Sequence, residues 1–82
     1  MSAPVPGSPR RPLTVTADIV ASVIRVVAAP GDSVTVGQTL LIMESMKMEI
    51  PLQSPADGVV TRIAVSVGDV VQEGDVLAEI SR

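Results

Sequence analysis

The sequence predicts a single all-β domain, and its composition gives the first reason. The 82 residues include 15 valines and 6 isoleucines but no Phe, Tyr or Trp, and β-branched side chains favour strands over helices. Short apolar runs alternate with glycine, proline and aspartate, a pattern typical of strands joined by tight turns. No segment has the length and periodicity of an amphipathic helix. The core must therefore be aliphatic, and a chain this short forms one small domain.

The strands can be placed from the apolar runs and from the turn residues between them. Pro-Gly-Asp at 30–32 and Gly-Asp at 68–69 predict tight turns, because glycine adopts positive φ without strain and aspartate bonds nearby backbone amides. Two short extended pieces, 33–34 and 70–71, follow these turns. The full strands are expected at 13–15, 20–27, 39–44, 48–52, 58–65 and 76–80.

An internal repeat appears when the chain is compared with itself at a shift of 37 residues. The Gly-Asp pair at 31–32 recurs at 68–69, and Gly37 recurs as Gly74, so the same bends are expected in each half. The other matched positions are Val23 with Val60, Arg25 with Arg62, Val26 with Ile63, Ala28 with Val65, Val34 with Val71, Leu40 with Leu77 and Met43 with Ile80. Each half alone has too few strands to be stable. We therefore expect two halves that face each other across a pseudo-twofold axis and close a valine-rich sandwich. The residues expected in its core include Val26, Val34, Ile63 and Val71.

The first twelve residues, MSAPVPGSPRRP, differ in composition from the rest of the chain. Four prolines, a glycine and two serines predict a flexible, partly extended arm over 1–12, followed by the domain at 13–82. The Arg-Arg pair is not followed by the apolar run of a secretion signal, because Thr14, Thr16 and Asp18 interrupt it. No stretch approaches the ~20 apolar residues that a membrane span requires.

Composition also limits the chemistry that the chain can perform. It contains no His or Cys, so the commonest general base, the thiol nucleophile and the commonest metal ligands are missing. The nine acidic residues are scattered, without a spacing that demands a shared site. The net charge of −3 argues against a nucleic-acid footprint. We therefore expect neither an independent enzyme nor a metal site.

One segment, ESMKMEI at 44–50, concentrates unusual side chains around a single amine. Lys47 is the only lysine in the chain, and it lies between the two copies of the repeat. The segment 44–49 is therefore expected to form a tight hairpin with Lys47 at its tip, where a rigid scaffold can present a reactive group. The alternative is an ordinary, solvated turn lysine.

The methionines are expected in two different places, the core and the tip of the hairpin. Apart from the initiator, they are Met43, Met46 and Met48. Met43 aligns with Ile80 and is expected in the core. Met46 and Met48 flank the tip, where an unbranched, polarisable side chain suits a recognition surface.

The motif Glu-Ser-Met-Lys-Met-Glu at 44–49 resembles the attachment motif of biotinyl domains, in which a lysine between two methionines carries biotin in amide linkage. The resemblance covers roughly 16–80, including a V-x-x-G-x-x-L turn in each half, and Lys47 is followed by 35 residues, similar to its placement in biotin carriers. The chain is similar to short, single-domain biotin carboxyl carrier proteins that lack a protruding thumb loop. Two departures are Ser45, where alanine is commoner, and Ala21, where the second half has Gly58.

This resemblance implies the hammerhead fold, a flattened barrel of two four-stranded antiparallel sheets. It implies that a biotin protein ligase attaches biotin to Lys47 from biotinyl-adenylate, with Met46 and Met48 as flanking recognition residues. It also implies that the chain, without catalytic residues of its own, shuttles carboxybiotin between a biotin carboxylase and a carboxyltransferase of an acyl-CoA or pyruvate-type carboxylase. Glu44 and Glu49 are either ligase contacts or solvated charges that discourage edge pairing.

Two other functions remain open at this stage. Lipoyl domains share the fold and also modify a tip lysine, but they usually have Asp before the lysine and Ala after it, unlike Met46 and Met48. A binding module of the same fold could leave Lys47 unmodified. The biotin reading implies a cytoplasmic carrier, which we expect to be monomeric and to bind neither nucleic acid nor membrane.

Overall fold

A computed structural model describes residues 12–82 of the chain. These residues form strands without any helix, so none of the described elements is a helix able to cross a membrane. Pro12 belongs to the first strand, and the rest of the expected arm lies outside the described residues. The strands are β1 (Pro12–Thr16), β2 (Ala21–Val26), β3 (Ser33–Val34), β4 (Thr39–Ser45), β5 (Met48–Gln53), β6 (Gly58–Ile63), β7 (Val70–Val71) and β8 (Val76–Ser81).

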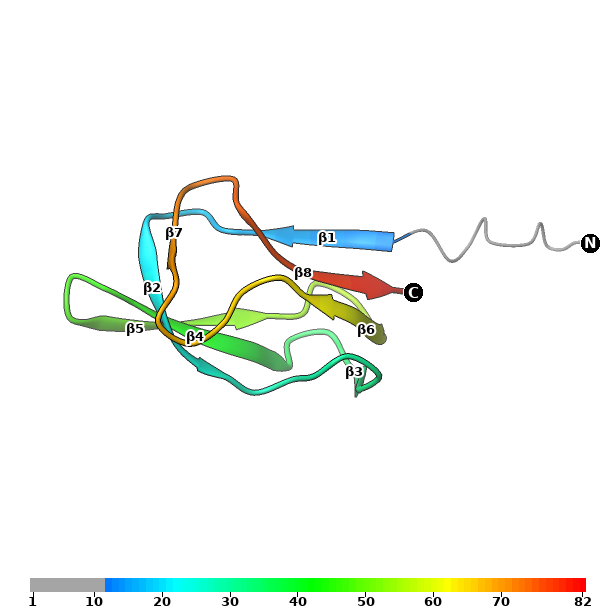
Figure 1. The fold of residues 1–82 in the computed structure, drawn as a ribbon. Coiled ribbons are helices and arrows are strands. Elements are labelled where there is room, and N and C mark those ends of the chain that lie inside the picture. Colours follow the sequence, from blue (N-terminus) through cyan, green and yellow to red (C-terminus); the bar gives the residue numbers. More distant parts are fainter. Residues whose placement is uncertain (1–11) are drawn as a thin grey trace, which may run out of the picture.

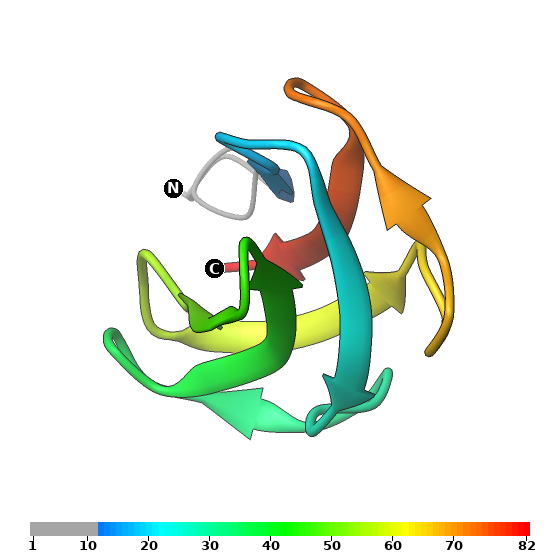
Figure 2. The ribbon, with the colours of Figure 1, turned by 90° about the vertical axis from the view of Figure 1, so that its left-hand side faces the viewer.

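The strands form two antiparallel sheets of four strands each. One sheet has the order β1-β8-β6-β3 and the other has the order β5-β4-β2-β7. Figure 2, a view onto the end that carries the β4–β5 turn, shows the strands arranged around a shared interior. This is the flattened all-β barrel predicted from the sequence, and both short strands have the predicted bounds.

The 37-residue repeat relates each strand of one sheet to a strand of the other sheet. A shift of 37 residues carries β2, β3 and β4 onto β6, β7 and β8, and it also relates β1 to β5. Backbone hydrogen bonds repeat in the same way, since the Gly74 amide donates to the Ala17 carbonyl at 2.8 Å and the Gly37 amide donates to the Ser54 carbonyl at 2.8 Å. The predicted pseudo-twofold relation is therefore confirmed. The inclusion of β1 and β5 in it was not predicted.

The repeated glycines occupy equivalent turns. Gly31, Gly37, Gly68 and Gly74 have φ of 96°, 89°, 98° and 91°, values that strain any residue with a Cβ. The aspartates beside two of them act as predicted. The Asp32 carboxylate accepts a hydrogen bond from the Ala29 amide at 2.9 Å, and the Asp69 carboxylate accepts one from the Ser66 amide, also at 2.9 Å.

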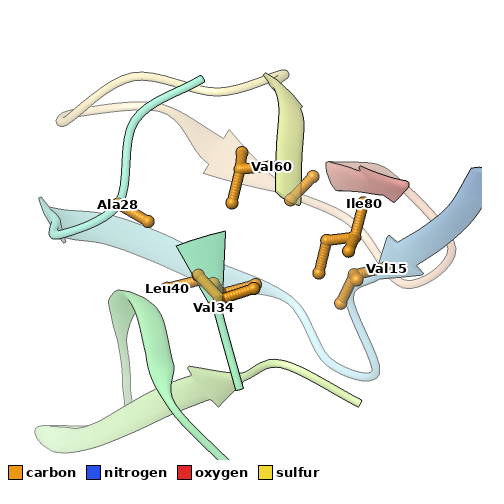
Figure 3. Packing of buried hydrophobic residues seen from close by; sticks show 7 residues of the cluster. Val15, Ala28, Val34, Leu40, Val60 and Ile80 are labelled. Atoms are coloured by element: carbon orange, nitrogen blue, oxygen red, sulfur yellow. The ribbon is translucent and has the colours of Figure 1, made fainter. Parts of the chain in front are cut away.

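The core consists of two pseudo-equivalent aliphatic clusters. One contains Val34 and Leu40 and is drawn in Figure 3; the other contains Val71 and Leu77. All four side chains are buried, and both leucines are fully inaccessible to solvent. Val26 and Ile63, which were also expected in the core, are only partly buried.

Val26 and Ile63 are half-buried and pack against the margins of these clusters. Each is the last residue of its strand, β2 or β6, and is paired with a neighbouring strand on one side only.

Gly58 and Ala21 begin equivalent strands, and the difference between them has a steric cause. A Cβ on Gly58 would lie 2.8 Å from Ile80 Cγ2 and closer still to the backbone carbonyl oxygen of Ser81. Gly58 is therefore required by the close approach of β8. Its backbone φ lies outside the left-handed region, unlike that of the four turn glycines.

Candidate functional site

The β4–β5 hairpin ends in a two-residue turn that holds Lys47. Ser45 and Met48 are the last paired residues, so Met46 and Lys47 alone form the turn. Both have positive φ, 54° for Met46 and 66° for Lys47. This is the signature of a type I′ turn, whose twist matches that of the flanking strands. The predicted hairpin tip is confirmed, but its backbone conformation was not predicted, since the chain has no Asn-Gly or Asp-Gly there.

The side chains at the tip project into solvent. Met46 is 89% exposed and Met48 is 63% exposed, and Lys47 is exposed as well. Met43, only a few residues earlier on β4, is 2% exposed. The methionines therefore divide as predicted into one core residue and two residues at the tip.

Charges flank the lysine without pairing with it. Glu44 and Glu49 lie opposite each other in the β4–β5 register, and both are exposed. They share the outer face of the sheet, because the neighbouring pair Met43 and Ile50 turns inward to the core. Within residues 12–82 the one ion pair joins Arg62 to Glu79. The Lys47 amine is thus free of any ion pair in the described part of the protein.

The tip continues the paired strands β4 and β5, at the end of the barrel remote from the C-terminus. In Figure 1 the β4–β5 turn lies at the left, whereas the start of β1 and the C-terminus lie at the right. Met43 anchors the hairpin in the core, one residue before Glu44. The exposed Lys47 side chain is therefore presented at this end of the barrel.

No cavity was found among the described residues, and no set of three His, Cys, Asp or Glu side chains in them could hold a metal ion. The site is a projecting side chain on a tight turn. Its geometry suits covalent attachment of a group and its presentation to another protein.

Comparison with known families agrees with this geometry. The model of the family described as biotin-requiring enzymes, which covers biotin and lipoyl attachment domains, matches residues 14–80. The chain belongs to this family. The family match includes the whole hairpin and nearly all of the described fold.

Individual relatives of this biotin/lipoyl family differ widely in length. The chain is 52% identical over 67 residues to a protein of Mycobacterium leprae named biotinylated protein TB7.3 homolog, and the match covers 82% of this chain and 94% of that protein. Among solved structures, it resembles part of a single-chain, multi-domain long-chain acyl-CoA carboxylase with a TM-score of 0.82 and 29% identity. That match covers 100% of this chain but 8% of the carboxylase.

A lipoyl domain shares the architecture. The structure of the lipoyl domain of the 2-oxoglutarate dehydrogenase complex from Azotobacter vinelandii matches with a TM-score of 0.73 and 22% identity, over 85% of this chain and 96% of that domain. This likeness establishes the fold alone. It is consistent with the hammerhead barrel expected for both branches of the biotin/lipoyl family.

Proposed function

We propose that the chain is a biotin carboxyl carrier in which Lys47 bears biotin through an amide bond. The observation that carries this proposal is the position of the chain's only lysine, exposed in a two-residue turn between two exposed methionines. The similarity to a protein named as biotinylated, over most of both chains, supports it.

The residues at the tip fit a covalently attached cofactor. Attachment requires a nucleophilic amine that another enzyme can reach from several sides, and Lys47 projects from a turn with no ion pair in the described residues. The exposed Met46 and Met48 offer apolar, adaptable contacts on both sides of the amine. No other lysine competes for the modification.

The chain contributes presentation, and a ligase contributes the chemistry of attachment. The Lys47 amine attacks the carbonyl carbon of biotinyl-adenylate, an amide bond forms, and AMP leaves. The amine must first lose a proton, and the chain contains no histidine to accept it. We therefore assign the general base to the biotin protein ligase. Amide formation also removes the positive charge of the side chain.

Once attached, biotin supplies a ring nitrogen that can carry a carboxyl group. The rigid barrel and the projecting turn let Lys47 enter a biotin carboxylase site and then a carboxyltransferase site. Tethering raises the effective concentration of the carried group at each site, while catalysis stays with those partners. The similarity to part of an acyl-CoA carboxylase supports carboxylases of that general class as partners. We infer a monomeric, cytoplasmic carrier without catalytic activity of its own.

Lipoylation is the competing modification, because a lipoyl domain has the same fold. The residues beside the lysine favour biotin, since Met46 and Met48 replace the Asp and Ala typical of lipoyl domains. The expected product is therefore a biotinyl group on Lys47.

Intact-protein mass spectrometry tests the proposal directly. The chain should be expressed with a biotin protein ligase and free biotin, and separately with a lipoyl ligase and lipoate. We expect one biotinyl group in the first case and none of either group on Lys47→Arg, because arginine cannot form the amide. Unmodified protein after the first reaction, or efficient lipoylation in the second, would overturn the proposal.

A further inference from the structure

The two outer faces of the barrel are pseudo-equivalent in backbone but differ in chemistry. One, the β2–β7 face, is defined by Val20, Ile24, Val67 and Val70. These side chains are 51%, 37%, 62% and 63% exposed. Val70 pairs with Ser22 across the two strands, and the Gly68 amide donates to the Val23 carbonyl at 2.8 Å. These backbone contacts place segment 67–70 alongside β2, so exposed aliphatic residues of both segments lie on the same side of the barrel.

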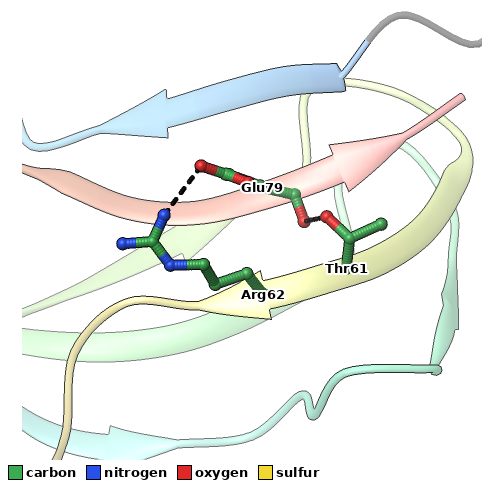
Figure 4. Close-up of polar contacts among 3 residues, drawn as sticks. All are labelled: Thr61, Arg62 and Glu79. Atoms are coloured by element: carbon green, nitrogen blue, oxygen red, sulfur yellow. Dashed lines mark hydrogen bonds and ion pairs between the residues drawn. The ribbon is translucent and has the colours of Figure 1, made fainter.

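The same four positions on the other half are mostly polar. This second surface, the β3–β6 face, consists of Asp57, Thr61, Pro30 and Ser33, reached from the first four residues by the 37-residue shift. Two of its polar side chains bond within the fold. The Asp57 carboxylate accepts a hydrogen bond from the Val36 amide at 2.8 Å. The Thr61 hydroxyl donates to the Glu79 carbonyl at 3.1 Å (Figure 4). Two exposed valines also lie on this side, Val59 in place of Ser22 and Val36 in place of Glu73.

The arginines beside these two faces differ in the same way. Arg62 on β6 pairs with Glu79 on β8, and the guanidinium and carboxylate approach to 3.0 Å (Figure 4). Its counterpart Arg25 on β2 is paired in register with Ile42 on β4. Arg25 is exposed and makes no ion pair with any residue in the range 12–82. The β2–β7 face thus combines exposed aliphatic side chains with a neighbouring cation free to bind a carboxylate.

We propose that the β2–β7 face docks the carrier on its biotin carboxylase partner, through an apolar surface of that partner that bears an acidic residue facing Arg25. This inference rests on the proposed biotin-carrier function. The face is continuous with the attachment hairpin, because Ser22 pairs with Val70 on one side and with Glu44 on the other. Contacts at this face would therefore orient the tip while Lys47 enters the partner's site.

The size of the face fits a transient partner better than a second copy of the chain. Four aliphatic side chains of this exposure present a few hundred Å², similar to the largest apolar patch of an ordinary monomer. A stable interface buries about 800 Å² on each partner. A carrier must leave one enzyme to reach the next, so a small apolar contact with one charge pair is appropriate.

The pseudo-twofold repeat supplies matched variants for the test. In Ile24→Thr/Val70→Ser, two residues of the β2–β7 face are replaced by those of the β3–β6 face. The reverse change, Thr61→Ile/Ser33→Val, is the control, and Arg25→Gln is compared with Arg62→Gln. Each protein is biotinylated, checked by intact mass and thermal melting, and then used as substrate for a purified biotin carboxylase component of an acyl-CoA carboxylase that carboxylates the wild-type holo-protein.

We expect the KM for Ile24→Thr/Val70→Ser to rise at least about fivefold with kcat changed less than about twofold, as for loss of a docking contact. Arg25→Gln should raise KM at low salt and reduce its dependence on ionic strength. The β3–β6 variants should behave as the wild type does. Equal effects on the two faces, or unchanged KM in fully biotinylated, folded variants, would overturn the docking assignment while leaving the carrier function intact.

Two further outcomes would also count against this inference. A wild-type protein that sediments as a dimer, and a monomeric Ile24→Thr/Val70→Ser variant, would assign the face to self-association. Failure of every biotin carboxylase tested to use the biotinylated wild type would contradict the proposed function, and the docking assignment with it.

Discussion

Glu44 lies directly opposite Glu49 on the outer face of the β4–β5 hairpin. Like charges in this position repel each other and destabilise a strand pair. The hairpin nevertheless carries both carboxylates, close to the lysine that we propose is modified. We infer that they either contact another protein or prevent other strands from pairing with the edge of this sheet.

Neutralising one of these carboxylates should stabilise the fold slightly. We expect Glu49→Gln to raise the free energy of unfolding by about 0.2–1 kcal/mol at low ionic strength. The gain should nearly vanish in 1 M salt, where the Debye length is about 3 Å. Denaturant melts at both ionic strengths measure the difference. Glu73→Gln, outside any strand pair, is the control, and an equal gain there would point to net charge as the cause.

The core leucines test whether the two core clusters contribute equally to stability. Leu40 and Leu77 are pseudo-equivalent, fully buried and located in different clusters. Each truncation to alanine should cost about 2–5 kcal/mol, with similar values at the two sites. Val26→Ala should cost less, because Val26 is half-buried. Urea unfolding of the three variants decides this, and a loss of stability confined to one leucine would show that the two clusters are not energetically equivalent.

The fold could be predicted from the sequence because its repeat is carried by residues with strong local preferences. Glycines at 31, 37, 68 and 74 specify bends that other residues resist, and the valine-rich runs between them specify strands. The relation of β1 to β5 was missed because no matched pair is identical and no glycine marks the shift there. Leu13 with Ile50 is only a loose aliphatic match, and Thr14 with Pro51 is no match at all. The backbone hydrogen bonds reveal it.

The candidate site was predictable in position but not in conformation. Lys47 could be placed at a hairpin tip because it lies between the two repeats. The positive φ of Met46 and Lys47 could not be predicted, since neither residue favours that region. Tertiary pairing on both sides of the turn, from Glu44 with Glu49 to Ser45 with Met48, overrides the local preference.

Two glycines should respond differently to the same substitution. Gly68→Ala adds a Cβ with nothing within 4 Å of it, so the cost is only that of a left-handed residue, about 1–2 kcal/mol. Gly58→Ala should cost more, because its Cβ meets the Ser81 backbone and one strand must move. Thermal melts rank the two variants. A Gly58→Ala protein as stable as wild type would show that β8 yields easily at its end.

The conformation of Met46 separates recognition from stability at the tip. Its φ of 54° is uncommon for a non-glycine residue, and asparagine tolerates this region better. We therefore expect Met46→Asn to raise the free energy of unfolding by a few tenths of a kcal/mol to about 1 kcal/mol, a gain set by relief of backbone strain. Met46 is 89% exposed, so its removal should leave no cavity.

The same substitution should slow biotinylation of Lys47 if the methionine is retained for recognition. The measurement pairs the melting temperature with the initial rate of biotin transfer by a biotin protein ligase, on the wild type, on Met46→Asn and on Met46→Leu. Leucine keeps the apolar volume without asparagine's preference for positive φ, so it should retain more of the rate and gain no stability. A more stable Met46→Asn protein that is biotinylated as fast as the wild type would show that Met46 has no part in ligase recognition. A Met46→Asn protein less stable than the wild type would show that the Met46 side chain makes contacts that stabilise the turn, despite its exposure.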